Sequence, residues 1–356
     1  MVANNDKTQW ENPMGTAGFE FVEFASPRPE ELEKLFVALG FTHIANHKSK
    51  NVKLFRQGNI NFILNAQSGS YAEEFQKIHG PCACALGFRV QNAQKAFEKA
   101  QELGAEIHAS NPGFMELNLP SVKGVGGALL FFINLYGEHN IYEIDFNLVP
   151  GVEINQNSVG LHTLDHVTHN VHKGGMDHWA HFYENLFNFK EIRYFDIKGS
   201  FTGLYSRAMT SPDGKIRIPI NESADENSQI AEFIREYNGS GIQHIALETD
   251  NIYETVEKLR ENGIEFLDTP DAYYKMLDNR LPGHGENVER LQKNRILIDG
   301  NPEEGRGLLL QIFTNTCVGP IFFEIIQRKG NDGFGEGNFQ ALFESIEQDQ
   351  IERGVL

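Results

Sequence analysis

Residues 251–263 read NIYETVEKLRENG, and they repeat without a gap the pattern of residues 92–104, NAQKAFEKAQELG. Both segments start with asparagine, end with glycine and carry a Glu-Lys pair in the same register, at an offset of 159 (251 − 92 and 263 − 104). Asparagine is a favoured N-cap, and glycine is favoured just past the end of a helix. Each segment is therefore predicted to be a helix, and the pair indicates an internal duplication.

The duplication extends outward from these helices. Residues 241–249 match residues 82–90 as a strand at the same offset. Residues 164–171 take the place of the strand near residues 19–25. Each half then reads βαβββ followed by βαβββ, and the second half carries an insertion at about residues 270–294. We predict an α+β fold of two tandem domains, residues 1–150 and 151–356. Each is an open curved β-barrel with helices outside and an inward face that lines a shared interior.

Length and composition are those of a packed globular protein, with 356 residues, 40% of them hydrophobic and 11% aromatic. A formal net charge of −18 argues against nucleic-acid or anionic-membrane partners. The three cysteines, Cys82, Cys84 and Cys317, are an odd number and indicate a reducing compartment. The N-terminus lacks an apolar signal region and the longest apolar run is too short for a membrane span. We therefore expect a soluble, cytoplasmic protein.

Residues 319–339, GPIFFEIIQRKGNDGFGEGNF, place one carboxylate, Glu324, inside an apolar strand. A strand this apolar is covered on both faces, so an ionised glutamate within it needs a partner. One candidate partner is a metal ion. The alternative is an ion pair with Arg or Lys at the end of the strand.

Overlaying the two halves bears on this choice, because three polar side chains of the second half fall on apolar residues of the first: His166 on Phe21, His244 on Ala85 and Glu324 on Phe132. Scattered core residues would have no reason to change together. One metal site, kept in the second half and filled with hydrocarbon in the first, predicts this pattern. Two histidines and one carboxylate form a facial triad that leaves positions open on an octahedral iron.

Nine segments resemble those of the 4-hydroxyphenylpyruvate dioxygenase family, which has the βαβββ repeats of the vicinal-oxygen-chelate superfamily. They are DHVTHNV (165–171), RYFDIKG (193–199), IRIPINE (216–222), GIQH (241–244), YYKML (273–277), RLPGHGE (280–286), LLLQIFT (308–314), FFEIIQRKG (322–330) and GFGEGNF (333–339). The resemblance covers essentially the whole chain, and its last third is the most specific part. None of the ligand positions departs from the family pattern.

The resemblance implies one Fe(II) per chain, held by His166, His244 and Glu324. It also implies a polar pocket of Ser206, Asn221, Gln243 and Gln311, and an aromatic wall of Phe313, Phe322, Phe334 and Phe339. The implied reaction takes 4-hydroxyphenylpyruvate and O2 to homogentisate and CO2 in tyrosine and phenylalanine catabolism, without a further catalytic acid or base. We expect a homo-oligomer, a dimer or a tetramer.

Three alternatives stay open. An extradiol catechol dioxygenase shares the architecture and the iron ligands, but it needs an acid-base group in its pocket. A hydroxymandelate synthase uses the same substrate and iron, and differs in its product. A metal-free binding protein on this fold would take up no Fe(II).

The last predicted element is a helix over residues 338–351 with one apolar stripe, which we expect to gate the pocket with Gly333, Gly335 and Gly337 as joints. Deleting the residues after Gly330 is expected to abolish turnover while iron still binds, measured by product formation and metal content. Retained turnover would dismiss the gate.

Overall fold

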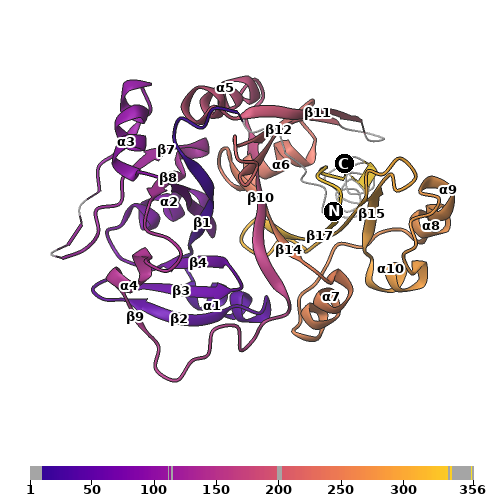
Figure 1. Ribbon diagram of the computed structural model, residues 1–356, viewed down its shortest axis with the longest axis horizontal. Coiled ribbons are helices and arrows are strands. Elements are labelled where there is room, and N and C mark those ends of the chain that lie inside the picture. The colour runs from indigo at the N-terminus through magenta and orange to yellow at the C-terminus, as the bar shows by residue number, and fades with distance from the viewer. Residues whose placement is uncertain are drawn as a thin grey trace, which may run out of the picture.

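The computed structural model describes residues 10–110, 112–113, 115–198, 203–335, 337–338 and 354. Its strands form two sheets that follow one another along the chain, as the change from indigo and magenta to orange and yellow in Figure 1 shows. Residues 149–160 connect the two halves and contain neither helix nor strand. We propose that the boundary between the two domains lies near residue 150, in this connection.

The first half contains β1 (Thr16–Ala25), α1 (Pro29–Ala38), β2 (Thr42–His47), β3 (Val52–Gln57), β4 (Ile60–Asn65), α2 (Tyr71–His79), β5 (Cys82–Val90), α3 (Ala93–Glu102), β6 (Ile107–His108), β7 (Ser121–Lys123), the 3-10 turn η1 (Val125–Gly127), β8 (Leu129–Ile133), α4 (Ile141–Asp145) and β9 (Phe146–Leu148).

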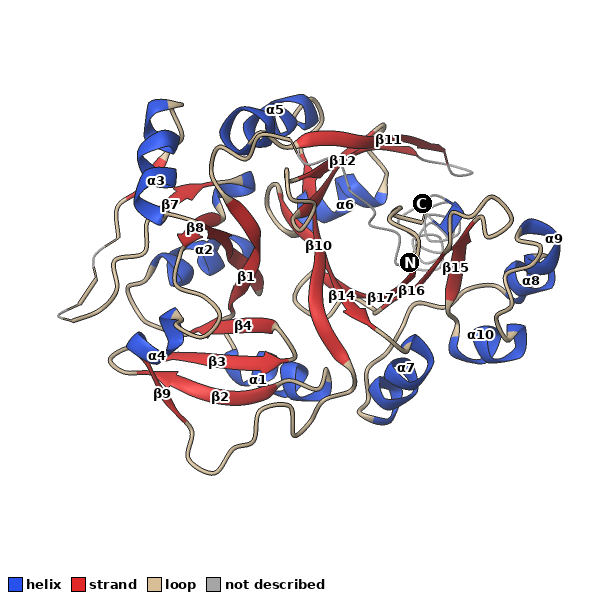
Figure 2. Cartoon of the chain, in the orientation of Figure 1, coloured by secondary structure: helices blue, strands red, loops and turns tan. Residues whose placement is uncertain are grey.

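The second half contains β10 (Leu161–Val171), α5 (Met176–Phe187), β11 (Lys190–Lys198), β12 (Gly203–Thr210), β13 (Arg217–Ser223), α6 (Gln229–Glu236), β14 (Gly241–Thr249), α7 (Ile252–Glu261), α8 (Asp271–Lys275), α9 (Leu277–Arg280), α10 (Val288–Asn294), β15 (Leu297–Gly300), β16 (Leu308–Phe313) and β17 (Phe322–Lys329). Helices α3, α5, α7 and α10 lie at the periphery of the molecule in Figure 2.

The strand order confirms the predicted βαβββ modules. The first sheet runs β6-β7-β8-β5-β1-β4-β3-β2-β9 and the second runs β11-β12-β13-β10-β14-β17-β16-β15. In each sheet the first strands of two modules pair antiparallel, β1 with β5 and β10 with β14, and each also pairs in parallel with the last strand of its own module. The asparagine caps of the two repeated helices are also present, because Asn92 accepts from Lys95 N and Asn251 from Glu254 N.

A single large core joins the halves. Buried apolar residues from helices and strands of both halves belong to one cluster, which includes Phe24 and Phe36 of the first half and Tyr183 and Phe323 of the second. The ring of Phe323 lies 5.8 Å from that of Phe62, across the boundary. Burial of this size is the main favourable term for the fold. Within the described ranges, no helix is both long enough and apolar enough to cross a bilayer.

Strand register corrects one part of the overlay. Ala246 pairs with Glu324 in the second sheet, and its counterpart at the same offset of 159, Gly87, pairs with Phe131 in the first. Phe131, and not Phe132 as the overlay predicted, is therefore the equivalent of Glu324. Because side chains alternate along a strand, Phe132 points into the joint core, whereas Phe131 points toward Phe21 with a ring separation of 5.8 Å. The apolar run LLFFI offered no marker to fix the register.

Helix α6 was not predicted. The repeat contained a signal for it, because Ser228 caps α6 by accepting from Ala231 N as Ser70 caps α2 by accepting from Glu73 N. Strand β15 pairs with β16 at the edge of the second sheet and completes the last βαβββ module. It follows the predicted insertion, whose described residues form α8, α9 and α10.

Gly126 marks a tight contact between the halves. At its φ of +65°, an added Cβ would lie 1.9 Å from the carbonyl oxygen of Ser240. Gly104 has a similar φ of +80° and nothing within 4 Å of an added Cβ.

Gly104→Ala is expected to cost about 1–2 kcal/mol of unfolding free energy from left-handed strain alone. Gly126→Ala adds a backbone overlap and should cost clearly more. Urea unfolding of both variants checks this, and equal losses would contradict it.

Candidate metal centre

Three neighbouring strands of the second sheet bring the predicted ligands together. His166 comes from β10, His244 from β14 and Glu324 from β17, and their exposed fractions are 2%, 4% and 1%. His166 Nε2 lies 3.3 Å from His244 Nε2 and 3.2 Å from Glu324 Oε2, and His244 Nε2 lies 3.4 Å from the same oxygen. Among the described residues, these three form the group of side chains that could hold a metal ion.

The partners of the two imidazoles favour metal binding through Nε2. Asp165 Oδ1 lies 2.8 Å from His166 Nδ1, and Gln243 Oε1 lies 3.0 Å from His244 Nδ1. An acceptor at each Nδ1 stabilises the tautomer with the proton there, which leaves the Nε2 lone pairs free to ligate. Thr168 Oγ1 lies 3.0 Å from His244 Nε2, so its hydroxyl can donate to that lone pair when no ion holds it.

Electrostatics keep the third donor ionised. Burial alone would raise the pKa of Glu324, but His166 and His244 beside it lower that pKa to about 2. Burial lowers the pKa of His244, which favours its neutral form. The site therefore offers one carboxylate near neutral pH together with imidazole nitrogens, which are ordinary ligands of first-row divalent metals.

The spacing of the three donors fits a divalent metal ion. An ion about 2.1 Å from each donor sets neighbouring donors about 3.0 Å apart in an octahedron and about 3.4 Å apart in a tetrahedron. The observed separations of 3.2–3.4 Å fall between these values. A closed structural site uses four protein ligands, so a site with three leaves room for substrate. Among the described residues, the ion-pair partners of Glu324 are these two histidines, and neither Arg nor Lys takes that place.

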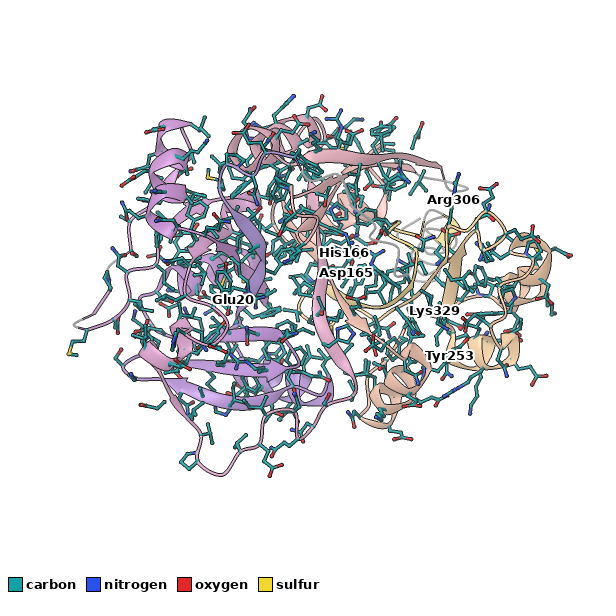
Figure 3. All side chains as sticks on the ribbon, viewed as in Figure 1. Glu20, Asp165, His166, Tyr253, Arg306 and Lys329 are labelled. Atoms are coloured by element: carbon teal, nitrogen blue, oxygen red, sulfur yellow. The ribbon has the colours of Figure 1, made fainter. Side chains whose placement is uncertain are left out.

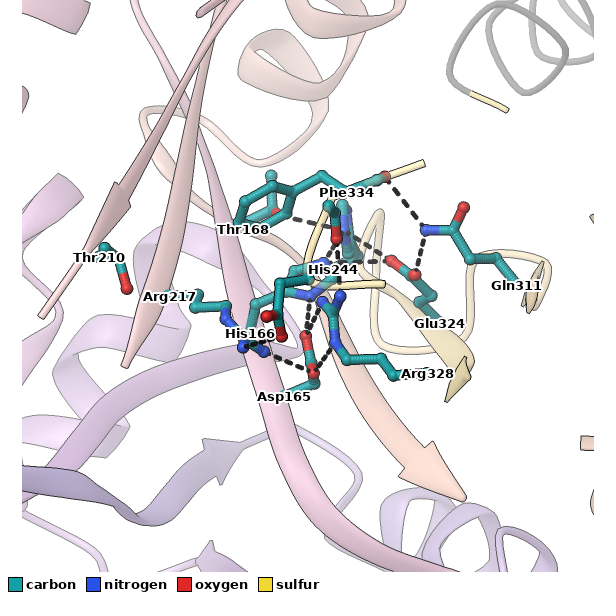
Figure 4. A network of polar contacts seen from close by, with 12 residues as sticks. Asp165, His166, Thr168, Thr210, Arg217, His244, Gln311, Glu324, Arg328 and Phe334 are labelled. Carbon is teal, nitrogen blue, oxygen red and sulfur yellow. Dashed lines mark hydrogen bonds and ion pairs between the residues drawn. The ribbon is translucent and has the colours of Figure 1, made fainter. Parts of the chain in front are cut away.

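A buried ion-pair network supports His166 from below (Figure 4). Asp165, beside His166 at the centre of the molecule in Figure 3, receives two hydrogen bonds from Arg328, at 2.6 and 2.8 Å, and one of 2.9 Å from Arg217. Burial alone would raise the pKa of Asp165, but Arg328 holds it well below its usual range. Arg328 Nη1 also donates to Gly333 O at 2.7 Å. The network thus ties the orientation of a ligand to the glycine-rich loop. Sequence analysis missed it.

Gln311 orients the carboxylate of Glu324. Its Nε2 donates to Glu324 Oε1 at 2.7 Å and lies 3.3 Å from Phe334 O, while its Oε1 accepts from Asn338 Nδ2 at 2.9 Å. These contacts occupy Oε1 of the carboxylate and turn Oε2 toward the histidines (Figure 4). The structure thus places Gln311, a predicted pocket residue, in direct contact with a predicted ligand.

Aromatic rings lie on two sides of the histidines. The ring of Phe322 stacks on that of His244 at 4.9 Å, and the ring of Phe313 lies 6.0 Å from Phe322. The ring of Phe334 meets His166 edge-on at 5.6 Å. Three predicted aromatic residues are therefore beside the triad. The fourth, Phe339, and the predicted helix over residues 338–351 lie outside the described residues apart from Asn338.

The remaining predicted polar residues meet next to His244. Asn221 Nδ2 lies 3.3 Å from both Gln243 Oε1 and Asn170 Oδ1, and Ser206 pairs with Asn221 across β12 and β13. A β-bulge lies at Gln243, next to His244: Thr168 pairs with His244, but the next residue, His169, pairs with Ile242 and skips Gln243. The buried Ser206 Oγ and Asn170 Nδ2 have no hydrogen-bond partner among the described residues.

His169 is a buried histidine on the opposite face of β10, 1% exposed and packed near Tyr183. Burial, with a smaller contribution from His244, lowers its pKa from 6.5 to about 3. Below pH 6.5 this histidine is protonated in the unfolded chain and stays neutral in the folded chain. The free energy of unfolding therefore falls on acidification, and this group contributes up to about 1.4 kcal/mol per pH unit to the fall.

Replacing this histidine removes its share of the acid sensitivity. His169→Gln is expected to lose less unfolding free energy than the parent between pH 7 and pH 5, because glutamine does not titrate. Urea unfolding at the two pH values measures the difference. Parallel changes in parent and variant would contradict the assignment.

Residues 10–147 match the family model described as hydroxyphenylpyruvate dioxygenase, N-terminal, and residues 163–276 match that of the glyoxalase/bleomycin resistance protein/dioxygenase superfamily. A 4-hydroxyphenylpyruvate dioxygenase of Pseudomonas aeruginosa is 58% identical over 98% of this chain and 99% of its own length. Hemolysin VllY of Vibrio vulnificus is 59% identical over 97% of this chain and 98% of its own.

Among solved structures, a variant of 4-hydroxymandelate synthase from Streptomyces coelicolor superposes with a TM-score of 0.82 at 25% identity. The superposition covers 95% of this chain and 100% of that one. The fold predicted from the repeats therefore agrees with that of a solved structure over nearly the whole chain.

Proposed function

Because the chain belongs to the 4-hydroxyphenylpyruvate dioxygenase family, we propose that it converts 4-hydroxyphenylpyruvate and O2 to homogentisate and CO2. One Fe(II) per chain would be held by His166, His244 and Glu324. The observation that carries the proposal is the convergence of these three buried donors within 3.4 Å of one another, in a chain 58% identical to a dioxygenase with that name.

When bound, ferrous iron supplies the electrons that let dioxygen react with a spin-paired organic substrate. The protein contributes ligand charge and orientation. A divalent ion held by two neutral imidazoles and one carboxylate would keep a net charge of +1. That charge favours binding of the carboxylate and keto oxygens of a 2-oxo acid. Asp165 and Gln311 hold His166 and Glu324 in place before substrate arrives, so less ordering is needed during binding.

The pocket residues suit the two ends of this substrate. Phe313, Phe322 and Phe334 offer ring faces and edges for the aromatic part and exclude water around it. Ser206, Asn221 and Gln243 offer hydroxyl and amide groups that can hold a phenol without transferring a proton. Ser206 Oγ and Asn170 Nδ2, which have no hydrogen-bond partner in the part of the chain that the structure describes, support a polar ligand here, because a buried polar group without a partner costs free energy.

The balance of the reaction is simple. The old carboxylate leaves as CO2 with its own two oxygens. One atom of O2 enters the new carboxylate formed at the keto carbon and the other becomes the new ring hydroxyl, while the side chain moves to the adjacent ring carbon. The amide and hydroxyl groups of the pocket fix the ring against the metal centre, which limits where that hydroxyl can be added. A role in tyrosine catabolism, a cytoplasmic location and a homo-oligomeric state stay predictions.

Anaerobic loading with Fe(II), addition of 4-hydroxyphenylpyruvate and then of oxygen tests the proposal. We expect equal molar amounts of O2 consumed, CO2 released and homogentisate formed. Formation of 4-hydroxymandelate would assign the chain to the synthase chemistry named for its structural relative. Yellow ring-opened products from catechols would assign it to the extradiol class. The 58% identity to a dioxygenase, against 25% to the synthase, favours homogentisate.

A further inference from the structure

The first half contains a cavity of about 710 Å³ on the face of its sheet that corresponds to the metal-bearing face of the second. Its size falls within the range of small-molecule sites, about 300–1,000 Å³. Phe21, Ala85 and Phe131, the register equivalents of His166, His244 and Glu324, all line it. The duplication therefore left a second hollow in which hydrocarbon replaces the ligands.

The floor of this cavity is apolar and aromatic. The rings of Phe21 and Phe131 lie 5.8 Å apart. Phe21 belongs to a small core cluster separate from the joint core of the molecule, and Phe131 packs against that cluster. Phe146, Val52 and Ile63 of the same cluster also line the cavity. A ligand with an apolar body would bury surface here, which is favourable at about 25 cal/mol per Å².

The charged residues at the cavity leave an excess of negative charge. Four carboxylates, Glu23, Glu74, Glu116 and Asp145, line it together with one lysine, Lys50, for a formal balance of −3 (one minus four) with histidines neutral. Lys50 forms an ion pair with Glu116, with 2.7 Å between Lys50 Nζ and Glu116 Oε2. Asp145 receives Leu117 N at 3.2 Å, and Glu74 is exposed to solvent.

Of the four carboxylates, Glu23 is the one next to the apolar floor. It lies two residues after Phe21 on β1 and so shares that residue's face of the strand. Asn65 Nδ2 donates to its Oε1 at 2.7 Å. Within the described ranges, no Lys, Arg or His forms an ion pair with it, and burial raises its pKa. A cationic ligand would supply the missing partner.

We propose that this cavity binds a small organic cation with an apolar body, of the aralkylamine class. Its ammonium group pairs with Glu23 and its ring packs on Phe21 and Phe131. Aromatic rings beside an ammonium group add a cation–π attraction of about 0.5–2 kcal/mol. The inference concerns the first half alone and does not depend on the reaction assigned to the second.

The test is isothermal titration calorimetry on the intact, iron-loaded protein with 2-phenylethylamine. 3-Phenylpropanoate, which has a ring on a short chain but the opposite charge, is the matched control ligand. We expect the amine to bind and the carboxylate not to. Glu23→Gln keeps the shape of the side chain and should weaken amine binding at least about tenfold, which corresponds to about 1.4 kcal/mol.

Ala85→Leu is a second variant that fills the cavity next to Glu23, its pairing partner across β1 and β5, and keeps the carboxylate. It should weaken binding as well. Both variants should keep the turnover of the parent, which shows that they are folded. Absence of binding by the parent at millimolar amine would overturn the proposal. Equal binding of the carboxylate would do so too, as would an affinity for the amine unchanged by both substitutions, because that would place the amine elsewhere.

Discussion

Alanine at His166, His244 or Glu324 removes bound iron and turnover together. Each substitution deletes one of three donors that lie within 3.4 Å of one another, and two donors cannot hold the ion in the same geometry. Loss of a residue that merely orients a ligand already costs about 10–100-fold in metal affinity or activity, so loss of a ligand itself is expected to exceed about 100-fold. Metal analysis after desalting and homogentisate formation are the two measurements.

The matched control is His178→Ala, which removes an exposed histidine on α5 of the same half. It should leave iron content and turnover at the level of the parent. Circular dichroism of all four variants separates loss of the site from loss of the fold. A triad variant that keeps a full equivalent of iron and normal turnover would show that the ion binds elsewhere.

Asp165→Ala is the second substitution with a large expected effect. Asp165 is 4% exposed and pairs with Arg328 and Arg217 in the interior. Removing one member of a buried ion-pair network leaves the others uncompensated and typically costs about 3–5 kcal/mol of unfolding free energy. His166 loses its orienting acceptor as well, so metal affinity should fall about 10–100-fold.

The pH dependence of this effect has a definite sign. Because the pKa of Asp165 is held below its ordinary value of 3.8, the carboxylate stabilises the fold fully above that value, and the contribution is lost as the pH falls below it. The difference between parent and Asp165→Ala should therefore be constant near neutral pH and shrink in acid. Urea unfolding at several pH values measures it.

Two further variants refine the interpretation. Asp165→Asn keeps an acceptor for His166 Nδ1 but removes the charge. Compared with Asp165→Ala, it should therefore restore most of the lost metal affinity but little of the lost unfolding free energy. Glu31→Ala breaks the exposed Arg28–Glu31 pair and should change stability by less than about 1 kcal/mol. If Asp165→Ala were as mild as Glu31→Ala, the buried network would not stabilise the fold.

Much of the architecture could be predicted because the chain contains it twice. The repeated helices at Asn92 and Asn251 gave the register, and the register gave the strand modules. Ser228 corresponds to Ser70 in the repeat and carries the same signal for α6. The assignment of Phe132 as the equivalent of Glu324 was wrong for a physical reason. Neighbouring phenylalanines look alike in sequence but point to opposite sides of a strand.

The site was predictable to the extent that its chemistry differs between the halves. Three donors that replace apolar residues stand out in an overlay, even with one position misplaced by a residue. The partners of Asp165 do not stand out, because Arg328 is 163 positions away and the chain contains many other cations. Likewise, a bulge lies at Gln243, next to His244 on β14, and a bulge leaves little trace in sequence.

Anomalous diffraction at the iron edge, from crystals of the protein loaded with Fe(II) under nitrogen, tests the metal centre most directly. We expect one peak per chain, in bonding contact with His166 Nε2, His244 Nε2 and Glu324 Oε2. A peak at another place, or a well-occupied ion that lacks any one of these three contacts, would contradict the account.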